Sequence, residues 1–284
     1  MSDFAFTVNP HASNPCSLAS LIQSLSKNRA LIFKMTQHEV LGRYKGSVIG
    51  MAWSFFNPIF MLSIYTFVFS VVFKSRWQVA NEPQSKTQFA VILFTGLIAL
   101  NLMSEVLNRA PGLILSNVNY VKKVVFPLEI LPLVAIMAAL FHSLVSINVL
   151  LAAFAVFNGF LHWTAIFLPL VMAPFVVLIS GLAWLLASLG VYLRDIGQSI
   201  GLITTVMMFV SPVFYPITAV PEKYRPVVML NPPSFIIEQL RKVLVWGELP
   251  DFRGLTVYFL IALAVAWAGY AWFQKTRKGF ADVL

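Results

Sequence analysis

The feature of this sequence that most constrains its fold is an abrupt change of character close to residue 50. Residues Gly42–Trp53, which we call the collar, are basic and spaced by glycines. They run directly into Met51–Phe73, which contains no charged residue. A helix needs about 20 largely apolar residues to cross a bilayer, and this segment is long enough. We therefore expect the collar to lie where the chain passes from water into a membrane.

The rest of the chain repeats this apolar character. Of the 284 residues, 59% are hydrophobic and 11% are charged, and the mean hydropathy is +0.81. Soluble domains carry about 25% charged residues, so the sequence predicts an all-α integral membrane protein. Six segments are apolar enough for transmembrane helices: 51–73, 89–107, 131–157, 164–189, 199–215 and 255–273. The fifth is short and ends in two prolines, Pro212 and Pro216, which oppose a straight continuation.

The charged residues indicate orientation. The net charge is +9, and the lysines and arginines lie mainly in loops beside apolar segments. Six spans put both termini on one side, and more of the basic residues lie on that side. This bias favours cytoplasmic termini. Membrane lipid headgroups explain the basic residues better than a nucleic acid partner does.

No cluster of reactive residues predicts an enzyme. The histidines lack metal-ligand spacing and Cys16 is the only cysteine, so we expect no metal site and no catalytic residue. The sequence also lacks the Gly-x4-Gly-Lys-Ser/Thr loop that binds ATP phosphates. Within the predicted spans, the only acidic or basic residues are Glu105 and His142. Ion-driven carriers usually place such groups near the middle of the bilayer, so that class is disfavoured.

The N-terminal part is expected to lie at the inner membrane surface. Residues 1–42 form a cytoplasmic tail, and residues 43–284 form the transmembrane domain. The apolar spacing over residues 17–41 predicts one or two amphipathic helices in the membrane interface. The alternative is an ordinary cytoplasmic helix packed on loops.

The longest connection, residues 212–251, lies outside under this topology. A short helix is predicted from Ser234, as its N-cap, to Val245. The connection is apolar, so it either re-enters the membrane while buried in protein or caps the outer surface.

Glycine, asparagine and aromatic residues in and beside the spans indicate where helices pack closely and where a channel is lined. Gly42, Gly46 and Gly50 have a spacing that lets another backbone approach closely. Asn57-Pro58 either serves helix packing or bends the first span to shape a pathway. Sugar rings pack well on aromatic side chains, although membrane aromatics also face lipid or form interface belts. The candidates for a channel lining are Phe55, Phe56, Asn57, Tyr65, Phe69, Phe209, Phe214 and Tyr215, with Trp53 in the collar.

Several of these pieces occur together, in order, from the collar to the end of the chain. The sequence resembles the ABC-2-type permeases that export polysaccharides, and the collar is most similar to the O-antigen and teichoic acid branch. The matching pieces are Arg43-Tyr44-Lys45-Gly46-Ser47 with Gly50 and Trp53, Asn57-Pro58, Asn117–Lys123 with Phe126-Pro127, Tyr192–Ile196, Ser211-Pro212-Val213 with Tyr215-Pro216, Asn231-Pro232 and Phe280-Ala281-Asp282.

The resemblance implies a transmembrane subunit in the bacterial inner membrane. It would act as a homodimer with two separate ATP-binding cassette subunits, which would hold ATP and Mg; this chain itself would hold no cofactor. The substrate would be a lipid-linked polysaccharide, and the helix before the collar would act as a gate helix.

The resemblance also implies roles for individual residues. Arg43, Tyr44, Lys45 and Trp53 would receive the lipid diphosphate. Loop 109–127 would be the coupling loop on the ATPase. The coupling residues would be Asn117, Tyr120, Lys122, Lys123, Phe126, Arg194 and Asp195. Re-entrant helices would form the outer gate, with Pro212, Pro216, Asn231 and Pro232.

Two alternatives stay open. The first is an exporter of the same architecture for another amphiphile, such as teichoic acid, a capsule glycan, a drug or a lipid. The second is a membrane-embedded transferase acting on lipid-linked sugars, which the absence of acid or histidine clusters disfavours.

Overall fold

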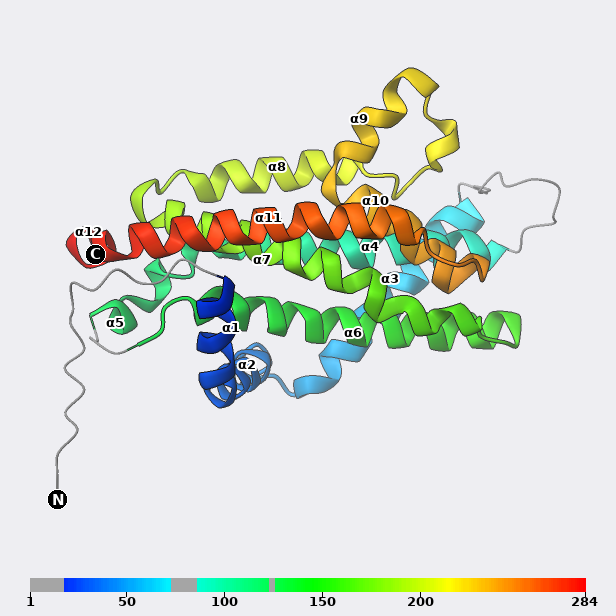
Figure 1. Cartoon of the computed structure of the whole chain (residues 1–284). Helices are drawn as coiled ribbons and strands as arrows, with labels where there is room; N and C mark the ends of the chain where they lie inside the picture. The colour runs from blue at the N-terminus through cyan, green and yellow to red at the C-terminus, as the bar shows by residue number, and fades with distance from the viewer. Residues whose placement is uncertain (1–17, 73–85, 123–125) are drawn as a thin grey trace.

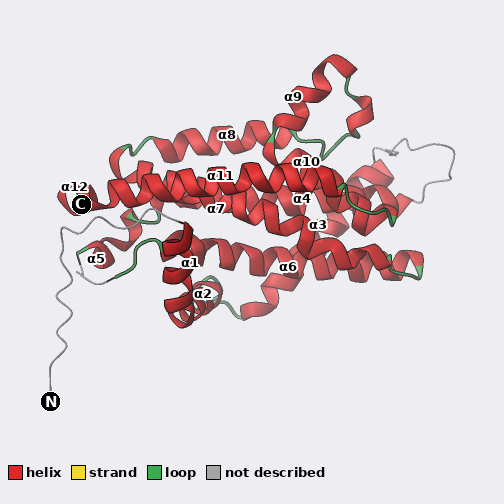
Figure 2. Ribbon diagram, in the orientation of Figure 1, coloured by secondary structure: helices red, strands yellow, loops and turns green. Residues whose placement is uncertain are grey.

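The computed structural model describes residues 18–72, 86–122 and 126–284, and every regular element within these ranges is helical (Figure 2). The longer helices are α1 (Leu18–Lys27), α2 (Arg29–Gly42), α3 (Trp53–Tyr65), α4 (Lys86–Arg109), α6 (Ile130–Asn158), α7 (Leu168–Tyr192), α8 (Ile196–Val210), α10 (Pro232–Arg241) and α11 (Phe252–Thr276). The shorter helices are α5 (Val118–Val121), α9 (Arg225–Leu230) and α12 (Phe280–Val283). Single turns of 3-10 helix lie at Gly50–Ala52, Ala110–Gly112, Leu115–Asn117, Trp163–Phe167, Ile217–Ala219, Glu222–Tyr224 and Arg277–Gly279, and π-helical turns at Thr66–Val72 and Lys242–Trp246.

The long helices run side by side along one axis (Figure 1). Helix α11 packs on α7, and α4 packs on α6 and α10. Five helical stretches in the described residues are long and apolar enough to cross a membrane: Gly50–Phe69, Gln88–Gly112, Ile130–Asn158, Trp163–Tyr192 and Phe252–Val283. The prediction of an all-α, multi-spanning protein is therefore confirmed. The first of these stretches is mostly exposed, whereas α4 is mostly buried inside the protein.

The fifth expected span, residues 199–215, is shorter than predicted. Helix α8 has 15 residues, which at about 1.5 Å per residue falls short of the roughly 30 Å hydrocarbon core. It ends at Val210 because Ser211 has an extended backbone and a proline follows. In Figure 1, α8 still runs along the bundle, from the end of α7 towards α9 and α10.

Close helix packing depends on glycines that the sequence did not single out. A Cβ at Gly181 would lie 2.6 Å from backbone atoms of Ala266, and one at Gly269 would lie 2.0 Å from the carbonyl oxygen of Gly181. Helices α7 and α11 therefore cross with their backbones in contact. By contrast, a Cβ at Gly42, Gly46 or Gly50 would meet nothing within 4 Å in this chain. The expected packing role of these three glycines is not found within the chain.

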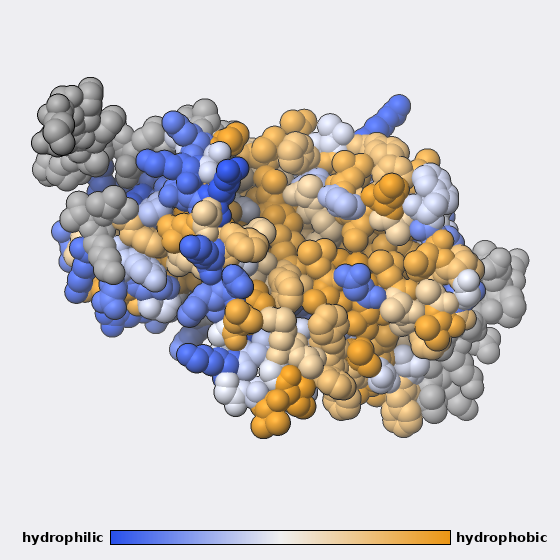
Figure 3. Space-filling view, turned by 90° about the horizontal axis from the view of Figure 1, so that it is seen from below, coloured by the Kyte–Doolittle hydropathy of each residue, from blue (hydrophilic) through white to orange (hydrophobic). Residues whose placement is uncertain are grey.

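The two N-terminal helices lie across the bundle rather than along it (Figure 1). Their surface carries exposed apolar side chains, among them Ile22 and Phe33. Their position in the membrane interface stays a prediction. In Figure 3, hydrophilic side chains gather towards the end of the molecule that carries α1, α5 and α12, while apolar side chains cover the rest of this face. The protein thus has one polar end and a broad apolar flank.

The prediction for the short outer helix needs one correction. Helix α10 begins at Pro232, with Asn231 at the N-cap position, and not after Ser234. Proline is favoured in the first turn of a helix because its missing N–H has no partner there. The Ser234 hydroxyl is buried inside the helix instead.

Candidate functional site

The collar forms the turn that joins α2 to α3. Gly46 and Gly50 have positive φ angles of 87° and 57°, a conformation that other residues adopt only with strain. These two glycines let the chain leave α2, which lies across the bundle, and enter α3, which runs along it. Their role in this chain is therefore in the backbone of the turn.

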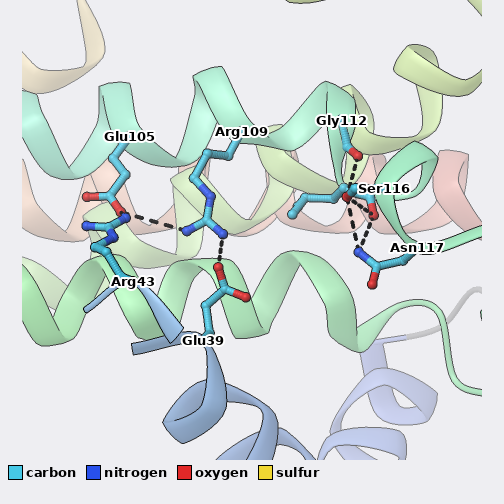
Figure 4. Close-up of polar contacts among 8 residues, drawn as sticks. Glu39, Arg43, Glu105, Arg109, Gly112, Ser116 and Asn117 are labelled. Atoms are coloured by element: carbon cyan, nitrogen blue, oxygen red, sulfur yellow. Dashed lines mark hydrogen bonds and ion pairs between the residues drawn. The ribbon is translucent and has the colours of Figure 1, made fainter. Parts of the chain in front are cut away.

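A row of four alternating charges connects the collar to the C-terminal part of α4 (Figure 4). The Arg43 guanidinium pairs with the Glu105 carboxylate, and the Arg109 guanidinium pairs with the Glu39 carboxylate. Arg109 also lies 3.8 Å from Glu105, which connects the two pairs. Arg43, predicted to bind a phosphate, thus has a carboxylate partner in this state. Lys45, its predicted companion, is exposed.

The neighbouring Tyr44 points in the other direction, towards α6. Its hydroxyl oxygen lies 3.3 Å from Nδ1 of His142, and the two rings meet edge to face. Burial raises the pKa of the Tyr44 phenol, partly offset by Arg43 and reinforced by Glu105. The phenol is therefore protonated, and able to donate a hydrogen bond, throughout the physiological pH range.

These collar residues line a polar cavity of about 340 Å³ between α3, α4 and α6. Its lining includes Asn57, Tyr65, Asn101, His142, Ser143 and Ser146, together with Arg43, Tyr44, Trp53 and Glu105. Amide, hydroxyl and imidazole groups therefore lie inside a bundle whose helices are otherwise apolar. Such groups bind ligands that both donate and accept hydrogen bonds.

The predicted channel-lining residues lie in four different settings. Trp53, Asn57 and Tyr65 line the polar cavity. Phe55, Phe56 and Phe209 are exposed on the surface of α3 and α8. Phe69 and Phe214 pack inside the protein, with ring centroids 6.3 Å apart. The Tyr215 hydroxyl donates to the Val210 carbonyl oxygen at 2.7 Å.

The residues predicted for the outer gate meet at the end of α8. The Asn231 side-chain amide donates to the Ser211 hydroxyl at 2.8 Å and to the Met207 carbonyl at 3.2 Å. Pro212 follows directly, and Pro232 begins α10. The sequence therefore identified segments that the fold brings together.

Residues 30–245 match the ABC-2 type transporter family. This chain belongs to that family. It is 24% identical over 264 residues to the O-antigen export system permease protein RfbA of Myxococcus xanthus, covering 92% of this chain and 98% of that protein. It is 26% identical over 256 residues to a protein of the same name from Klebsiella pneumoniae, covering 89% and 95%. The Polysialic acid transport protein KpsM of Escherichia coli is 21% identical over 243 residues, covering 84% and 90%.

In this ABC-2 transporter protein, the expected coupling loop consists of short turns between α4 and α6. Asn117 occupies the N-cap position of α5, and its side-chain amide donates to the Leu113 carbonyl at 2.8 Å. The rings of Tyr120 and Phe126 stack with centroids 4.3 Å apart. Lys122 is exposed, and Lys123 lies outside the described residues. Arg194 and Asp195 are exposed on the loop between α7 and α8.

Two buried charged residues were missed by the sequence analysis. Arg241 is 1% exposed; it pairs with Glu238 at 2.7 Å and donates to the carbonyl oxygens of Ile92 and Val213. Glu129, 7% exposed, accepts from Ser24 at 2.8 Å and pairs with Arg277 at 2.7 Å. Both lie between the predicted spans, Arg241 in the short helix predicted after Ser234 and Glu129 in a loop, so the apolar pattern gave no sign of their burial.

The charge row had a partial signal in the sequence. Glu39 and Arg43 are four residues apart, as are Glu105 and Arg109, and this spacing puts opposite charges on one face of a helix. In the fold, the two segments exchange partners. Arg43 pairs with Glu105, and Arg109 pairs with Glu39. The described residues include no group of three or more side chains that suits a metal ion.

Proposed function

We propose that this chain is the transmembrane subunit of an ATP-driven exporter that carries a lipid-linked polysaccharide, most closely of the O-antigen type, from the cytoplasmic to the outer face of the inner membrane. Membership of the ABC-2 type transporter family, along nearly the whole length of polysaccharide export relatives, supports this function. The observation that carries it is the polar cavity beside the collar, between helices long enough to span the membrane. A saccharide needs hydrogen-bonding groups of this kind, whereas the apolar part of a drug or lipid does not.

Energy comes from separate subunits in this proposal. The sequence has no phosphate-binding loop, so two ATP-binding cassette subunits hold ATP and Mg. The turns over 109–127 and the loop at Arg194 and Asp195 are the contacts with these subunits. Their exposed side chains at the polar end of the molecule support this assignment.

Two copies of the chain form the pathway for the glycan. Helix α3 supports this arrangement because the spanning stretch that contains it, Gly50–Phe69, is largely exposed and carries Phe55 and Phe56 on its surface. These rings, with Phe209 on α8, offer faces on which sugars slide. Helix α8 and the turn that follows complete the sixth crossing, and Asn231 anchors the outer gate to it.

The lipid diphosphate arrives at the collar. Arg43 provides positive charge at the polar cavity, and Lys45 is exposed two residues further along the collar. The exposed apolar side chains of α1 and α2 support a position at the inner membrane surface. Both termini then face the cytoplasm.

A reconstituted transport assay tests this function. The chain is co-expressed with an ATP-binding cassette subunit from the same organism, purified as a complex and placed in vesicles with lipid-linked glycan. We expect ATP hydrolysis to rise with the glycan, and glycan to become accessible to an added lectin at the opposite face only when ATP is present. Stimulation by drugs or phospholipids, with no response to the glycan, would contradict the proposal.

A further inference from the structure

The cavity between α3, α4 and α6 holds a hydrogen-bonding atom that the proposed function leaves unused. His142 is fixed on one side, where Nδ1 meets the Tyr44 hydroxyl at 3.3 Å. On the other side, Nε2 is buried and has no hydrogen-bond partner among the described residues. A buried polar atom without a partner is unfavourable. His142 lines the cavity, so a ligand there would complete this buried atom once a small rotation of the ring exposes it.

The chemistry of the missing partner follows from the imidazole ring. If Nδ1 accepts from Tyr44, then Nε2 carries the proton and needs an acceptor. If Nδ1 donates instead, then Nε2 has a lone pair and needs a donor. A hydroxyl group satisfies either tautomer, whereas a phosphate oxygen satisfies only the first. A hydroxyl-bearing ligand is thus the better match.

The neighbours of His142 fit the same ligand. Asn101 is exposed although Leu100 and Leu102 beside it are 2% and 1% exposed, and it lines the cavity with Asn57. Each amide both donates and accepts. Trp53, 46% exposed, adds an aromatic ring at the cavity, and Arg43 adds a positive charge.

We propose that this cavity binds the sugar that lies next to the diphosphate of the lipid-linked glycan, and that His142 is a specificity-determining residue for it. This inference rests on the proposed function and adds which part of the substrate one protomer recognises, namely the first sugar. The volume of about 340 Å³ lies at the lower end of the roughly 300–1,000 Å³ of small-molecule pockets. It suits one sugar unit beside Arg43 and not a length of chain.

Binding to the whole complex, with its ATPase partner in nanodiscs, tests this site. The probes are a polyprenyl diphosphate that carries one sugar, the same lipid without sugar, and phosphatidylglycerol. The variants are His142→Ala, His142→Gln, whose amide nitrogen reaches the place of Nε2, and Arg43→Ala. Asn148→Ala is the matched control because Asn148 lies on the same helix, bonds to the Leu144 carbonyl and does not line the cavity.

We expect His142→Ala to weaken binding of the sugar-bearing lipid about tenfold, as for one lost buried hydrogen bond, and to leave the sugar-free lipid unchanged. His142→Gln retains most of the affinity, and Arg43→Ala weakens both diphosphate lipids. An equal loss for both lipids in His142→Ala overturns the sugar site. Competition by phosphatidylglycerol that depends on His142 also overturns it, in favour of a general headgroup site.

The two proposals fail in different ways. A wild-type complex that neither binds nor exports lipid-linked glycan overturns the proposed function. A wild-type complex that exports the glycan, with His142→Ala and His142→Gln both binding like the wild type, overturns the sugar site alone. If the alanine variant does not assemble, Tyr44→Phe, which removes the partner of Nδ1, is expected to weaken binding of the sugar-bearing lipid and not of the sugar-free lipid. Unchanged binding of the sugar-bearing lipid by Tyr44→Phe then overturns the sugar site.

Discussion

The guanidinium of Arg43 pairs with the carboxylate of Glu105, and this contact joins the turn after α2 to the C-terminal part of α4. The same carboxylate lies 3.8 Å from Arg109, at the end of α4 where the proposed coupling loop begins. The site proposed for the lipid phosphate is thus connected by charge to the segment proposed to meet the ATPase. This arrangement leads to the first two predictions.

Replacing both Arg43 and Lys45 by alanine is expected to reduce glycan export at least about tenfold, since charge-assisted hydrogen bonds contribute about 1.5–3 kcal/mol each. The measurement is export in the reconstituted complex, after gel filtration has shown intact assembly. Lys34→Ala, which removes an exposed charge from α2, is the control. Unchanged export by an assembled double variant contradicts the phosphate role.

Replacing Glu105 by glutamine is expected to strengthen binding of a lipid diphosphate about two- to fivefold, because partly exposed ion pairs are worth up to about 1 kcal/mol. The side chains of Arg43 and Glu105 are 40% and 25% exposed. The substitution frees Arg43 from its competing carboxylate. Measured affinity in nanodiscs checks it, and a weaker affinity would show that Glu105 positions Arg43 for the ligand rather than competing with it.

Replacing Arg241 by alanine is expected to destabilise the protein by about 2–5 kcal/mol, because it leaves a cavity in place of a 1% exposed side chain and removes the donor to two buried carbonyl oxygens. Arg241 also joins α10 to α4 and to Val213, at the start of the outer connection. Thermal unfolding of the detergent-purified protein measures the loss. Arg253→Ala, at an exposed position, is the matched control and should change little.

Replacing Gly181 by alanine is expected to cost about 1–3 kcal/mol through overpacking, since its Cβ would lie 2.6 Å from the backbone of Ala266. Backbone atoms cannot move aside as a flexible side chain can. Gly197→Ala is the control, because a Cβ at Gly197 meets nothing within 4 Å. Similar unfolding temperatures for the two variants would contradict direct contact between α7 and α11.

Much of the fold could be predicted because hydrophobicity and length decide whether a segment spans a membrane. The spans expected at 89–107, 131–157, 164–189 and 255–273 each lie within an observed helix of spanning length. The first expected span, 51–73, matches the observed stretch Gly50–Phe69 in part, and Phe73 lies outside the described residues. The span at 199–215 is shorter than expected because a local break at Ser211 ends α8. The observed N-cap of α10, Asn231, lies three residues before the predicted Ser234, because Pro232 and Pro233 begin the helix although serine is also a common N-cap.

The sequence by itself determined that this protein is a helical membrane protein, and it singled out the collar, Asn57, Asn231 and the prolines of the outer connection. Apolar composition and residues with special backbone preferences act locally, so they can be read one segment at a time. Only the tertiary structure decided that Arg43 meets Glu105 and that His142 lies beside Tyr44. These partners are 62 and 98 residues apart in the chain, and no local rule connects them. Their proximity depends on how α3, α4 and α6 pack, which is a property of the whole bundle.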